Sequence, residues 1–320
     1  MKNRGLNGRR YFLPAVIVSL LLFTSCGNSG QKTKQLDTPT NGQIAIGVDA
    51  SYKLLLEAEK FTFEALYKYA RVDLQFKTEA DVINDFMNDS IPLMFVSRKL
   101  SDKQAEYLRS IQYIPRTTLI ARDAIALVVN KENPDTSLFF QTVKDIFTGK
   151  ITRWNDINPH SKLGKLSVVF DHFKSGNPRY FKERFALDTF PSTCSAVKSN
   201  EEVISYIENN KNGIGIVSVN WISDNQDSVS NKFLKRVKVV GIALEGDNDP
   251  GTKFYKPYQA YIAEDSYPFT RELYCINRQP YTGLAHGFAA FVAGEKGQLI
   301  VLHSGLVPAA MPVRIVEIKH

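Results

Sequence analysis

The stretch that decides the fold is ARDAIALVVNKENPDTSLFFQTVKDIFTGKITRWNDI, residues 121–157, in the middle of the chain. Within it, AIALVVN (124–130) carries no charge, and an uninterrupted apolar run of this length is typical of a strand buried on both faces. LFFQTVKDIFTG (138–149) follows, and after it comes the apolar run LSVVF (166–170). We therefore expect a central strand that opens a β-α-β series.

A similar series precedes this stretch. The predicted elements alternate in the order strand 42–48, helix 54–70, strand 72–76, a helix over 79–89 and strand 91–97. A β-α-β-α-β order argues for a parallel sheet with right-handed crossovers.

Capping residues mark the starts of several helices. Thr78 precedes the helix at 79–89, and Ser101 with Gln104 forms a capping-box pattern for the next helix. Ser199 and Glu202 form another such pattern, ahead of an apolar strand.

That strand is GIGIVSV (213–219), whose glycines do not make a dinucleotide-binding fingerprint, because no third glycine and no helix follow in place. Residues 283–305 predict two short helices that break near Gly294. The fold class predicted from these elements is α/β, in two lobes without internal repeats.

The charge of the chain does not favour nucleic acid as a partner. The 320 residues carry a formal charge of +7, of which residues 1–25 contribute +4. The remainder has 36 basic against 33 acidic residues and no basic cluster with interleaved aromatics. We expect no nucleic-acid binding.

Residues 1–25 are predicted to be a lipoprotein signal peptide. A basic start is followed by YFLPAVIVSLLLF (11–23), which as a helix spans ~20 Å, short of the ~30 Å hydrocarbon core. Small residues then precede Cys26, a pattern that resembles the bacterial lipobox, where acyl chains such as palmitate are attached to the cysteine. Residues 26–42 are expected to be a flexible tether. The alternative is an ordinary secreted protein in which Cys26 is incidental.

The remaining cysteines, Cys194 and Cys275, match no metal or redox motif. They are either buried free thiols or a disulfide, and their spacing leaves both open.

A second informative stretch is DHFKSGNPRYFKERF (171–185), which reads as a strand end, a tight turn and a helix. Asn177 is a good N-cap and Pro178 suits the first helical position. Lys174 and Arg179 add positive charge around this helix start. A serine or asparagine before proline is also common at helix starts that bind no ligand, so the residues of this turn alone leave its role open.

Several blocks of the chain resemble the phosphate-binding lipoproteins of bacterial phosphate ABC importers, within the type II periplasmic binding protein superfamily. The most specific is Asp123-Ala-Ile-Ala, Val128-Val129-Asn130, Asn133-Pro134 and Asp145-Ile-Phe-Thr-Gly-Lys-Ile-Thr-Arg-Trp154. VSRKLSDKQ (96–104), SYPFTRELYCI (266–276) and EKGQLIVLHSGLVP (295–308) are similar to further family segments.

The resemblance implies two Rossmann-like lobes joined by two crossing strands, with ligand in the cleft between them. Lobe 1 would comprise residues 43–125 and 268–320, and lobe 2 residues 126–267. Hinges are expected near Asp123–Val128 and Tyr267–Leu273, where closure would bury the ligand.

A desolvated oxyanion needs many donors, and helix N-termini at the carboxyl ends of strands supply free backbone N–H groups. In relatives a Ser-Gly-Thr-like turn holds the phosphate, which Ser175-Gly176-Asn177 matches with Asn in place of Thr. We expect Ser51, Ser97 and Ser175 to converge. The residues assigned to the ligand are Asp49, Ser51, Ser97, Arg98, Asp171, Ser175, Gly176, Asn177 and Arg179.

Two departures from the family concern the ligand. KTEADVIND (77–85) stands where several phosphate binders carry a Gly-Ser-rich loop, and Asp171 stands where many carry arginine. Asp171 would repel phosphate unless it accepts a proton from the ligand or pairs with Lys174 or Arg179. Monohydrogen phosphate carries such a proton and sulfate does not, so the carboxylate of Asp171 or Asp49 would discriminate between them.

The function implied is capture of inorganic phosphate by a monomer at the periplasmic face of the cell envelope, anchored to a membrane through Cys26, and delivery to an ABC transporter permease. The alternatives are binding of another oxyanion or small organic acid for transport or sensing, or hydrolysis of phosphoesters. The five histidines are scattered without ligand spacing and no Gly-x-Ser-x-Gly elbow is present, so we expect no enzyme, no metal and no cofactor.

Overall fold

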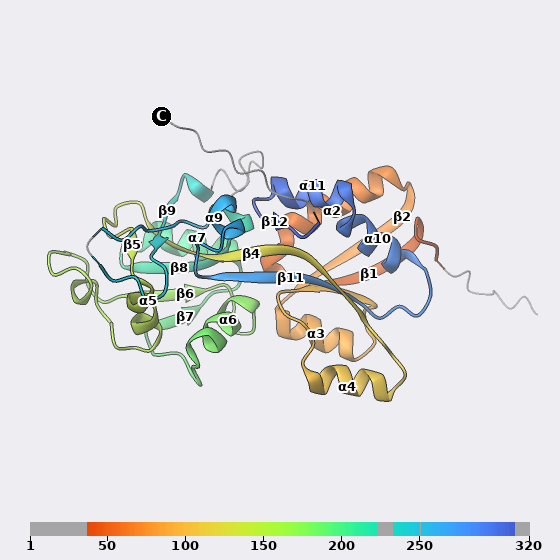
Figure 1. Cartoon of the computed structure of the whole chain (residues 1–320), viewed down its shortest axis with the longest axis horizontal. Helices are drawn as coiled ribbons and strands as arrows, with labels where there is room; N and C mark the ends of the chain where they lie inside the picture. The colour runs from red at the N-terminus through yellow and green to blue at the C-terminus, as the bar shows by residue number, and fades with distance from the viewer. Residues whose placement is uncertain (1–36, 223–232, 250, 311–320) are drawn as a thin grey trace, which may run out of the picture. The chain divides into compact units, whose positions relative to one another are not determined.

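The computed structural model describes residues 37–222, 233–249 and 251–310, which form an α/β structure (Figure 1). The predicted signal peptide, Cys26 and most of the tether lie outside the described residues. The described residues form one compact unit. None of the helices in the described ranges is long and apolar enough to cross a membrane.

The strands are β1 Asn41–Asp49, β2 Tyr69–Lys77, β3 Leu93–Val96, β4 Arg116–Asn130, β5 Ser137–Leu138, β6 Ser167–Phe170, β7 Cys194–Ala196, β8 Gly213–Ser218, β9 Val237–Val239, β10 Gly241–Ile242, β11 Thr270–Asn277 and β12 Val307–Pro308. The α-helices are α2 Lys53–Leu66, α3 Glu79–Met87, α4 Asp102–Ser110, α5 Phe140–Phe147, α6 Gly176–Phe185, α7 Asn200–Asn209, α9 Gln259–Ala263, α10 Leu284–Ala293 and α11 Glu295–His303. Short 3-10 helices are η1 Ala50–Tyr52, η2 Trp154–Asp156 and η3 Val219–Trp221.

Most of the strands join one sheet in the order β2-β1-β3-β11-β4-β8-β6-β7. β1 pairs in parallel with β2 and β3, as the β-α-β-α-β pattern predicts. β6 likewise pairs in parallel with β7 and β8. The two parallel groups are connected by β11 and β4, which pair antiparallel with each other (Figure 1).

β4 is the strand that connects the two groups. It is longer than the apolar run 124–130 suggests, because it begins at Arg116. Its first part pairs with β11 over Arg116–Ala124, and its second part pairs with β8 over Ile125–Val129. A single strand therefore runs from the pairing with β11 into the pairing with β8, and its pairing partner changes between Ala124 and Ile125. The lobe boundaries predicted from the sequence remain a prediction.

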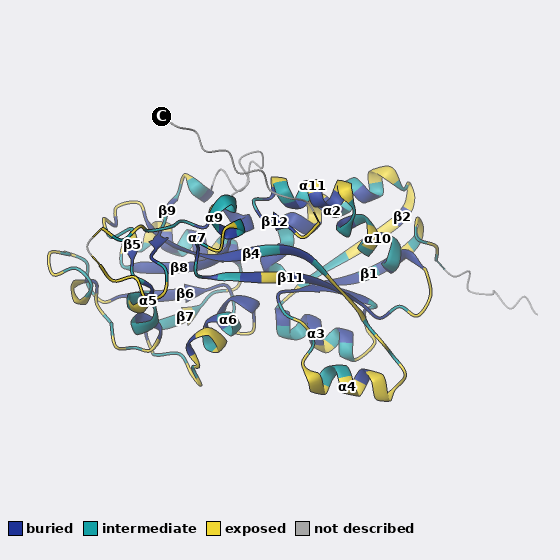
Figure 2. Ribbon diagram, in the orientation of Figure 1, coloured by how far each residue is buried: buried dark blue, intermediate teal, exposed yellow. Residues whose placement is uncertain are grey.

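The core follows the central strands, which are the most buried elements (Figure 2). One apolar cluster extends from β1 and β3 through β4 to β8. On the β6 side, the rings of Phe147 and Phe181 stack with centroids 4.3 Å apart, which holds α6 against α5.

Cys275 is buried and Cys194 half-buried, and both are free thiols, so the disulfide alternative is wrong.

Two capping predictions are corrected. Ser199 accepts a hydrogen bond from the Glu202 amide, but Glu202 accepts from the Lys198 amide instead of that of Ser199, so the capping box is incomplete. The helix α6 begins at Gly176 with Ser175 as N-cap, so Asn177 is not the cap and Pro178 is the third helical residue. Proline is tolerated there because the first four N–H groups of a helix have no intrahelical acceptor.

One buried acid takes part in none of the ion pairs found among the described residues. Glu59, on α2, is fully buried, and neither carboxylate oxygen has a hydrogen-bond partner among the described residues. Burial raises its pKa from 4.5 to about 9, because an unpaired carboxylate is costly in an apolar interior. Glu59 is therefore protonated in the folded protein at neutral pH.

Glu59 should make stability fall as pH rises. Between pH 4.5 and 9 the unfolded chain has lost this proton while the folded chain keeps it, so unfolding releases a proton. Glu59→Gln should remove this contribution, which amounts to ~4 kcal/mol between pH 5 and 8 at ~1.4 kcal/mol per unit. Urea unfolding at several pH values measures it. Glu57→Gln, exposed on the same helix, is the control, and an equal pH slope in Glu59→Gln and the unchanged protein would contradict the expectation.

Candidate functional site

Several sequence-distant segments meet at the start of α6. A methyl carbon added to Gly176 would lie 2.5 Å from Ser97 Oγ, 2.8 Å from Asp49 Oδ2 and 3.2 Å from Arg271 Nη1. Asp49 ends β1, Ser97 follows β3 and Arg271 lies on β11. The glycine is required because any side chain at this position would occupy the space into which these polar groups converge.

We call Asp49, Ser51, Gly176, Asn177 and Arg271 the buried polar cluster. Ser51 lies in it because its backbone N–H donates to Asp49 Oδ1 at 3.0 Å. Several side-chain atoms of the cluster have no hydrogen-bond partner among the described residues. These atoms are Asp49 Oδ2, Ser51 Oγ, Asn177 Oδ1, and Arg271 Nη1 and Nη2. Because buried polar groups are normally paired, such a group of atoms indicates a place for a polar ligand.

Asp171 organises the turn before α6. Its Oδ1 accepts hydrogen bonds from Ser175 Oγ at 2.7 Å and from Asn177 Nδ2 at 3.2 Å. It therefore pairs with neither Lys174 nor Arg179, the two partners that the sequence suggested. The hydroxyl and amide of its own turn are closer, and this pairing fixes the backbone of the helix start.

Arg271 was missed by the sequence analysis. Its Nε donates to Asp123 Oδ2 at 2.8 Å, and Asp123 also accepts hydrogen bonds from Tyr52 and Ser218. The guanidinium lies over the Tyr52 ring, 5.2 Å from the centroid to Cζ. The signal that was available is a charged residue inside the strand segment TRELYCI, where a buried arginine demands a carboxylate or an anion.

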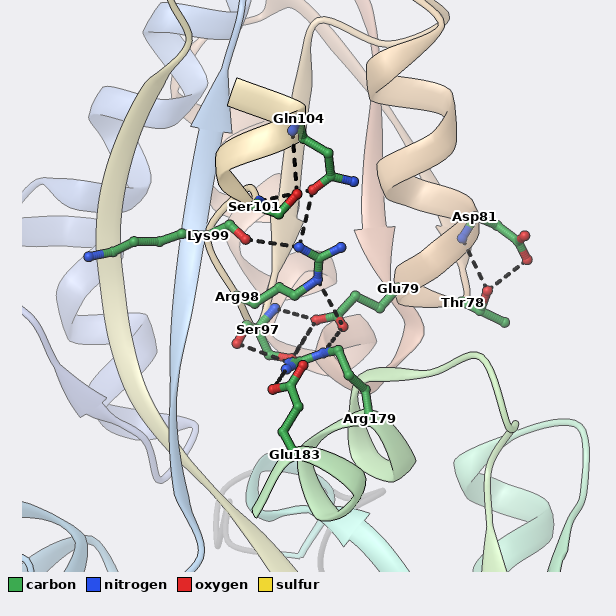
Figure 3. Close-up of polar contacts among 10 residues, drawn as sticks. All are labelled: Thr78, Glu79, Asp81, Ser97, Arg98, Lys99, Ser101, Gln104, Arg179 and Glu183. Carbon is green, nitrogen blue, oxygen red and sulfur yellow. Dashed lines mark hydrogen bonds and ion pairs between the residues drawn. The ribbon is translucent and has the colours of Figure 1, made fainter. Parts of the chain in front are cut away.

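The predicted ligands Ser97, Arg98 and Arg179 face another residue that was missed, Glu79 at the start of α3 (Figure 3). Ser97 donates to Glu79 Oε1 from its backbone N at 3.0 Å and from Oγ at 2.6 Å. Arg179 Nε donates to Glu79 Oε2, and Arg179 Nη2 donates to Ser97 Oγ at 3.0 Å. We call these four residues the Glu79 network.

Arg98 is the outermost member of the Glu79 network. Its Nη1 donates to the Lys99 carbonyl at 3.0 Å and to Gln104 Oε1 at 3.2 Å, and its Nε lies 4.0 Å from Glu79 Oε2 (Figure 3). It is therefore directed toward the start of α4 and Glu79, not toward the buried polar cluster. A pocket of about 210 Å³ opens beside the network, and its lining includes the cations Arg98, Lys174, Arg179 and Lys182.

Burial and charge set the protonation of the acids. Burial, and then the nearby Glu79 carboxylate, raise the pKa of Asp49 to about 7. Burial also raises the pKa of Asp171, against the hydrogen bonds from Ser175 and Asn177. For Glu79, burial works to raise the pKa, but the attraction and hydrogen bonds of Arg179 outweigh it and hold the pKa below its ordinary value.

The arrangement is suited to a small oxyanion. The guanidinium Nη atoms of Arg271 and the first backbone N–H groups of α6 supply donors, and Asp49 supplies a group that holds or accepts a proton. No cluster of three or more His, Cys, Asp or Glu side chains that could hold a metal occurs among the described residues.

Known proteins similar to this chain agree with the fold described above. A family model described as the PBP superfamily domain matches residues 33–296. The chain belongs to this superfamily. The predicted fold class is confirmed, because solved proteins of the type II periplasmic binding protein fold superpose on the chain.

One such protein is a putative phosphate ABC transporter substrate-binding protein with bound phosphate from Clostridium perfringens, with TM-score 0.69, 21% identity, and coverage of 84% of this chain and 100% of that one. Another is an ABC-type phosphate transport receptor from Vibrio cholerae, with TM-score 0.62, 20% identity, and coverage of 83% and 100%.

Curated relatives in sequence are phosphate-binding proteins PstS of staphylococci. The protein of Staphylococcus epidermidis is 26% identical over 219 residues, which is 67% of this chain and 61% of the relative. That of Staphylococcus aureus (strain bovine RF122 / ET3-1) is 25% identical over 217 residues, 67% of this chain and 62% of the relative. The chain thus spans about three fifths of the length of these relatives.

Gly176→Ala tests the close approach at the site. Alanine is the better helix former, so any loss of stability must come from the contacts with Ser97, Asp49 and Arg271. We expect the free energy of unfolding in urea to fall by ~1–3 kcal/mol. Gly164→Ala, whose methyl group would meet only Asn212 Nδ2 at 3.4 Å, should leave stability unchanged or slightly higher. Equal effects of the two substitutions would argue against a crowded site at Gly176.

Proposed function

We propose that this protein is a solute-binding lipoprotein that captures inorganic phosphate in the buried polar cluster and delivers it to an ABC importer. The observation that carries the proposal is the buried guanidinium of Arg271, whose Nη1 and Nη2 have no partner among the described residues, beside the start of α6. A buried cation with unused donors at a helix N-terminus favours a small anion. The printed names of the relatives from Staphylococcus and of the Clostridium protein support phosphate as that anion.

The cellular part of the proposal rests on the first 42 residues. Residues 1–25 would direct export, and acyl chains on Cys26 would anchor the protein to a membrane at the periplasmic face of the cell envelope, as a monomer on a flexible tether. Anchoring keeps a captured ligand near a membrane-embedded permease. The printed names of the two solved proteins support the transport context, since one is a putative phosphate ABC transporter substrate-binding protein and the other an ABC-type phosphate transport receptor.

Ligand capture would involve closure of the proposed lobes, 43–125 with 268–320 and 126–267, about β4 and β11. Asp49, Ser51 and Arg271 would belong to lobe 1, and the start of α6 to lobe 2. An anion between them would be bound by donors of both lobes, so that binding and closure are coupled.

A second candidate is a binder of a different small anion. It is favoured by the carboxylates of Asp49, Glu79 and Asp171 around the site, since these oppose a highly charged ligand. Calorimetry of the detergent-solubilised full chain with phosphate, sulfate and small carboxylic acids decides between the two candidates. A phosphoester hydrolase would instead turn over a chromogenic phosphate ester, and we expect no turnover.

Arg271 should be the main anchor of the ligand. Arg271→Gln is expected to weaken phosphate binding by at least about a hundredfold, because it removes a buried charge and two charge-assisted hydrogen bonds. Isothermal calorimetry measures the affinity, and thermal melting verifies folding. Should this variant not fold, Arg271→Lys retains the charge and should still bind more weakly. Arg116→Gln, an exposed position on β4, is the control, and unchanged affinity in the folded Arg271 variants would refute the assignment.

Asp49 is expected to determine the discrimination between phosphate and sulfate. Its Oδ2 has no hydrogen-bond partner among the described residues, whereas Asp171 Oδ1 already accepts two hydrogen bonds. At pH 8, above its pKa of about 7, Asp49 is ionised, can accept the proton of hydrogen phosphate and repels sulfate. Asp49→Asn should lower the phosphate-to-sulfate affinity ratio by about tenfold or more. Asp171→Asn should retain the ratio. A ratio that is unchanged in both variants would end the carboxylate hypothesis.

A further inference from the structure

Glu79 occupies the donors that the sequence assigns to the ligand. It is the first residue of α3, and its side chain is only 2% exposed. The Ser97 amide and hydroxyl both donate to Oε1, while Arg179 donates to both carboxylate oxygens. A carboxylate that accepts hydrogen bonds from a strand-end amide, a hydroxyl and a bidentate arginine is held as a bound oxyanion would be (Figure 3).

The charge of Glu79 acts on the buried polar cluster as well. Its pKa is held below the ordinary value by Arg179, so it is ionised at neutral pH. Its Coulombic effect is the largest contribution, after burial, to the raised pKa of Asp49. The field of Glu79 therefore reaches the position where Gly176, Asp49 and Arg271 converge, and it opposes negative charge there.

We propose that Glu79 is a specificity-determining residue, an internal carboxylate that occupies the anion donors of Ser97 and Arg179 and weakens the binding of doubly charged oxyanions in the adjacent buried polar cluster. This inference rests on the proposed function, because it concerns the same site. Its consequence is that the ligand makes fewer hydrogen bonds than the donors of the site would permit. A singly charged oxyanion is disfavoured less than a dianion, because the repulsion scales with the charge of the ligand.

A purely structural role of Glu79 gives the opposite expectation. Glu79 and Arg179 connect α3 to α6, the Ala80 amide donates to the Lys174 carbonyl at 3.2 Å, and Lys174 Nζ lies 3.7 Å from Asp81 Oδ1. If Glu79 only holds these two helices together, neutralising it loosens the site and weakens phosphate binding. The direction of the change in affinity therefore separates the two roles.

The experiment is phosphate calorimetry at pH 8, where phosphate is mainly dianionic, on the detergent-solubilised full-length protein and its variants. Glu79→Gln removes the charge and retains the shape, and we expect phosphate affinity to rise by about tenfold. Glu183→Gln is the matched control, because Glu183 also accepts from Arg179, at 2.6 Å from Nη1, but is 63% exposed. The phosphate affinity of the Glu183→Gln variant should change by less than about twofold. Repeating the titration at pH 6 should give a smaller gain for Glu79→Gln, because more of the phosphate is then singly charged.

The outcomes are distinct. If the unchanged protein binds phosphate and Glu79→Gln binds equally or more weakly, the inference is overturned and the proposed function stands. If only Glu79→Gln binds, the inference is supported and phosphate is not the natural ligand. If neither binds, both are overturned. Thermal melting verifies folding. If the Glu79→Gln variant does not fold, Glu79→Ser replaces it with the same expectation.

Discussion

The site depends on one buried ion pair, between Arg271 on β11 and Asp123 on β4. The two residues are direct cross-strand partners, and Arg271 Nε lies 2.8 Å from Asp123 Oδ2. Both are almost fully buried, so removing either charge would leave the other unpaired, at a cost of about 3–5 kcal/mol. Because Asp123 takes only Nε, the pair holds the guanidinium while Nη1 and Nη2 remain directed at the start of α6.

Further polar and charged side chains surround this ion pair. Tyr52 and Ser218 donate to Asp123, which fixes the carboxylate from η1 and β8. Glu79 and Arg179 form another pair a short distance away, on α3 and α6. The site thus combines two arginines with several carboxylates, and its preference among ligands depends on the balance of these charges around the bound ligand. Such a balance makes ligand choice sensitive to single substitutions that leave the fold intact.

The sequence predicted much of the secondary structure, because that depends on local patterns. The apolar runs at β1, β3 and β8, the caps Thr78 and Ser101 and the break at Gly294 are all present. The start of α6 was predicted two residues late. Asn177 is a buried donor to Asp171 and not the helix cap, and the sequence alone does not distinguish these two roles of an asparagine. The site was predicted in part: Asp49, Ser97 and Gly176 lie together, whereas Arg98 and Arg179 face Glu79.

The sequence by itself determined the α/β class, the order of strands and helices, and the segments whose ends supply hydroxyls and amides. These follow from the period of apolar residues and from capping chemistry, which act over a few residues. Only the tertiary structure decided which charges meet. Arg271 lies 148 positions from Asp123, and Arg179 lies 100 positions from Glu79. Which buried cation faces which carboxylate depends on strand register and helix packing, and no local pattern in the chain encodes that choice.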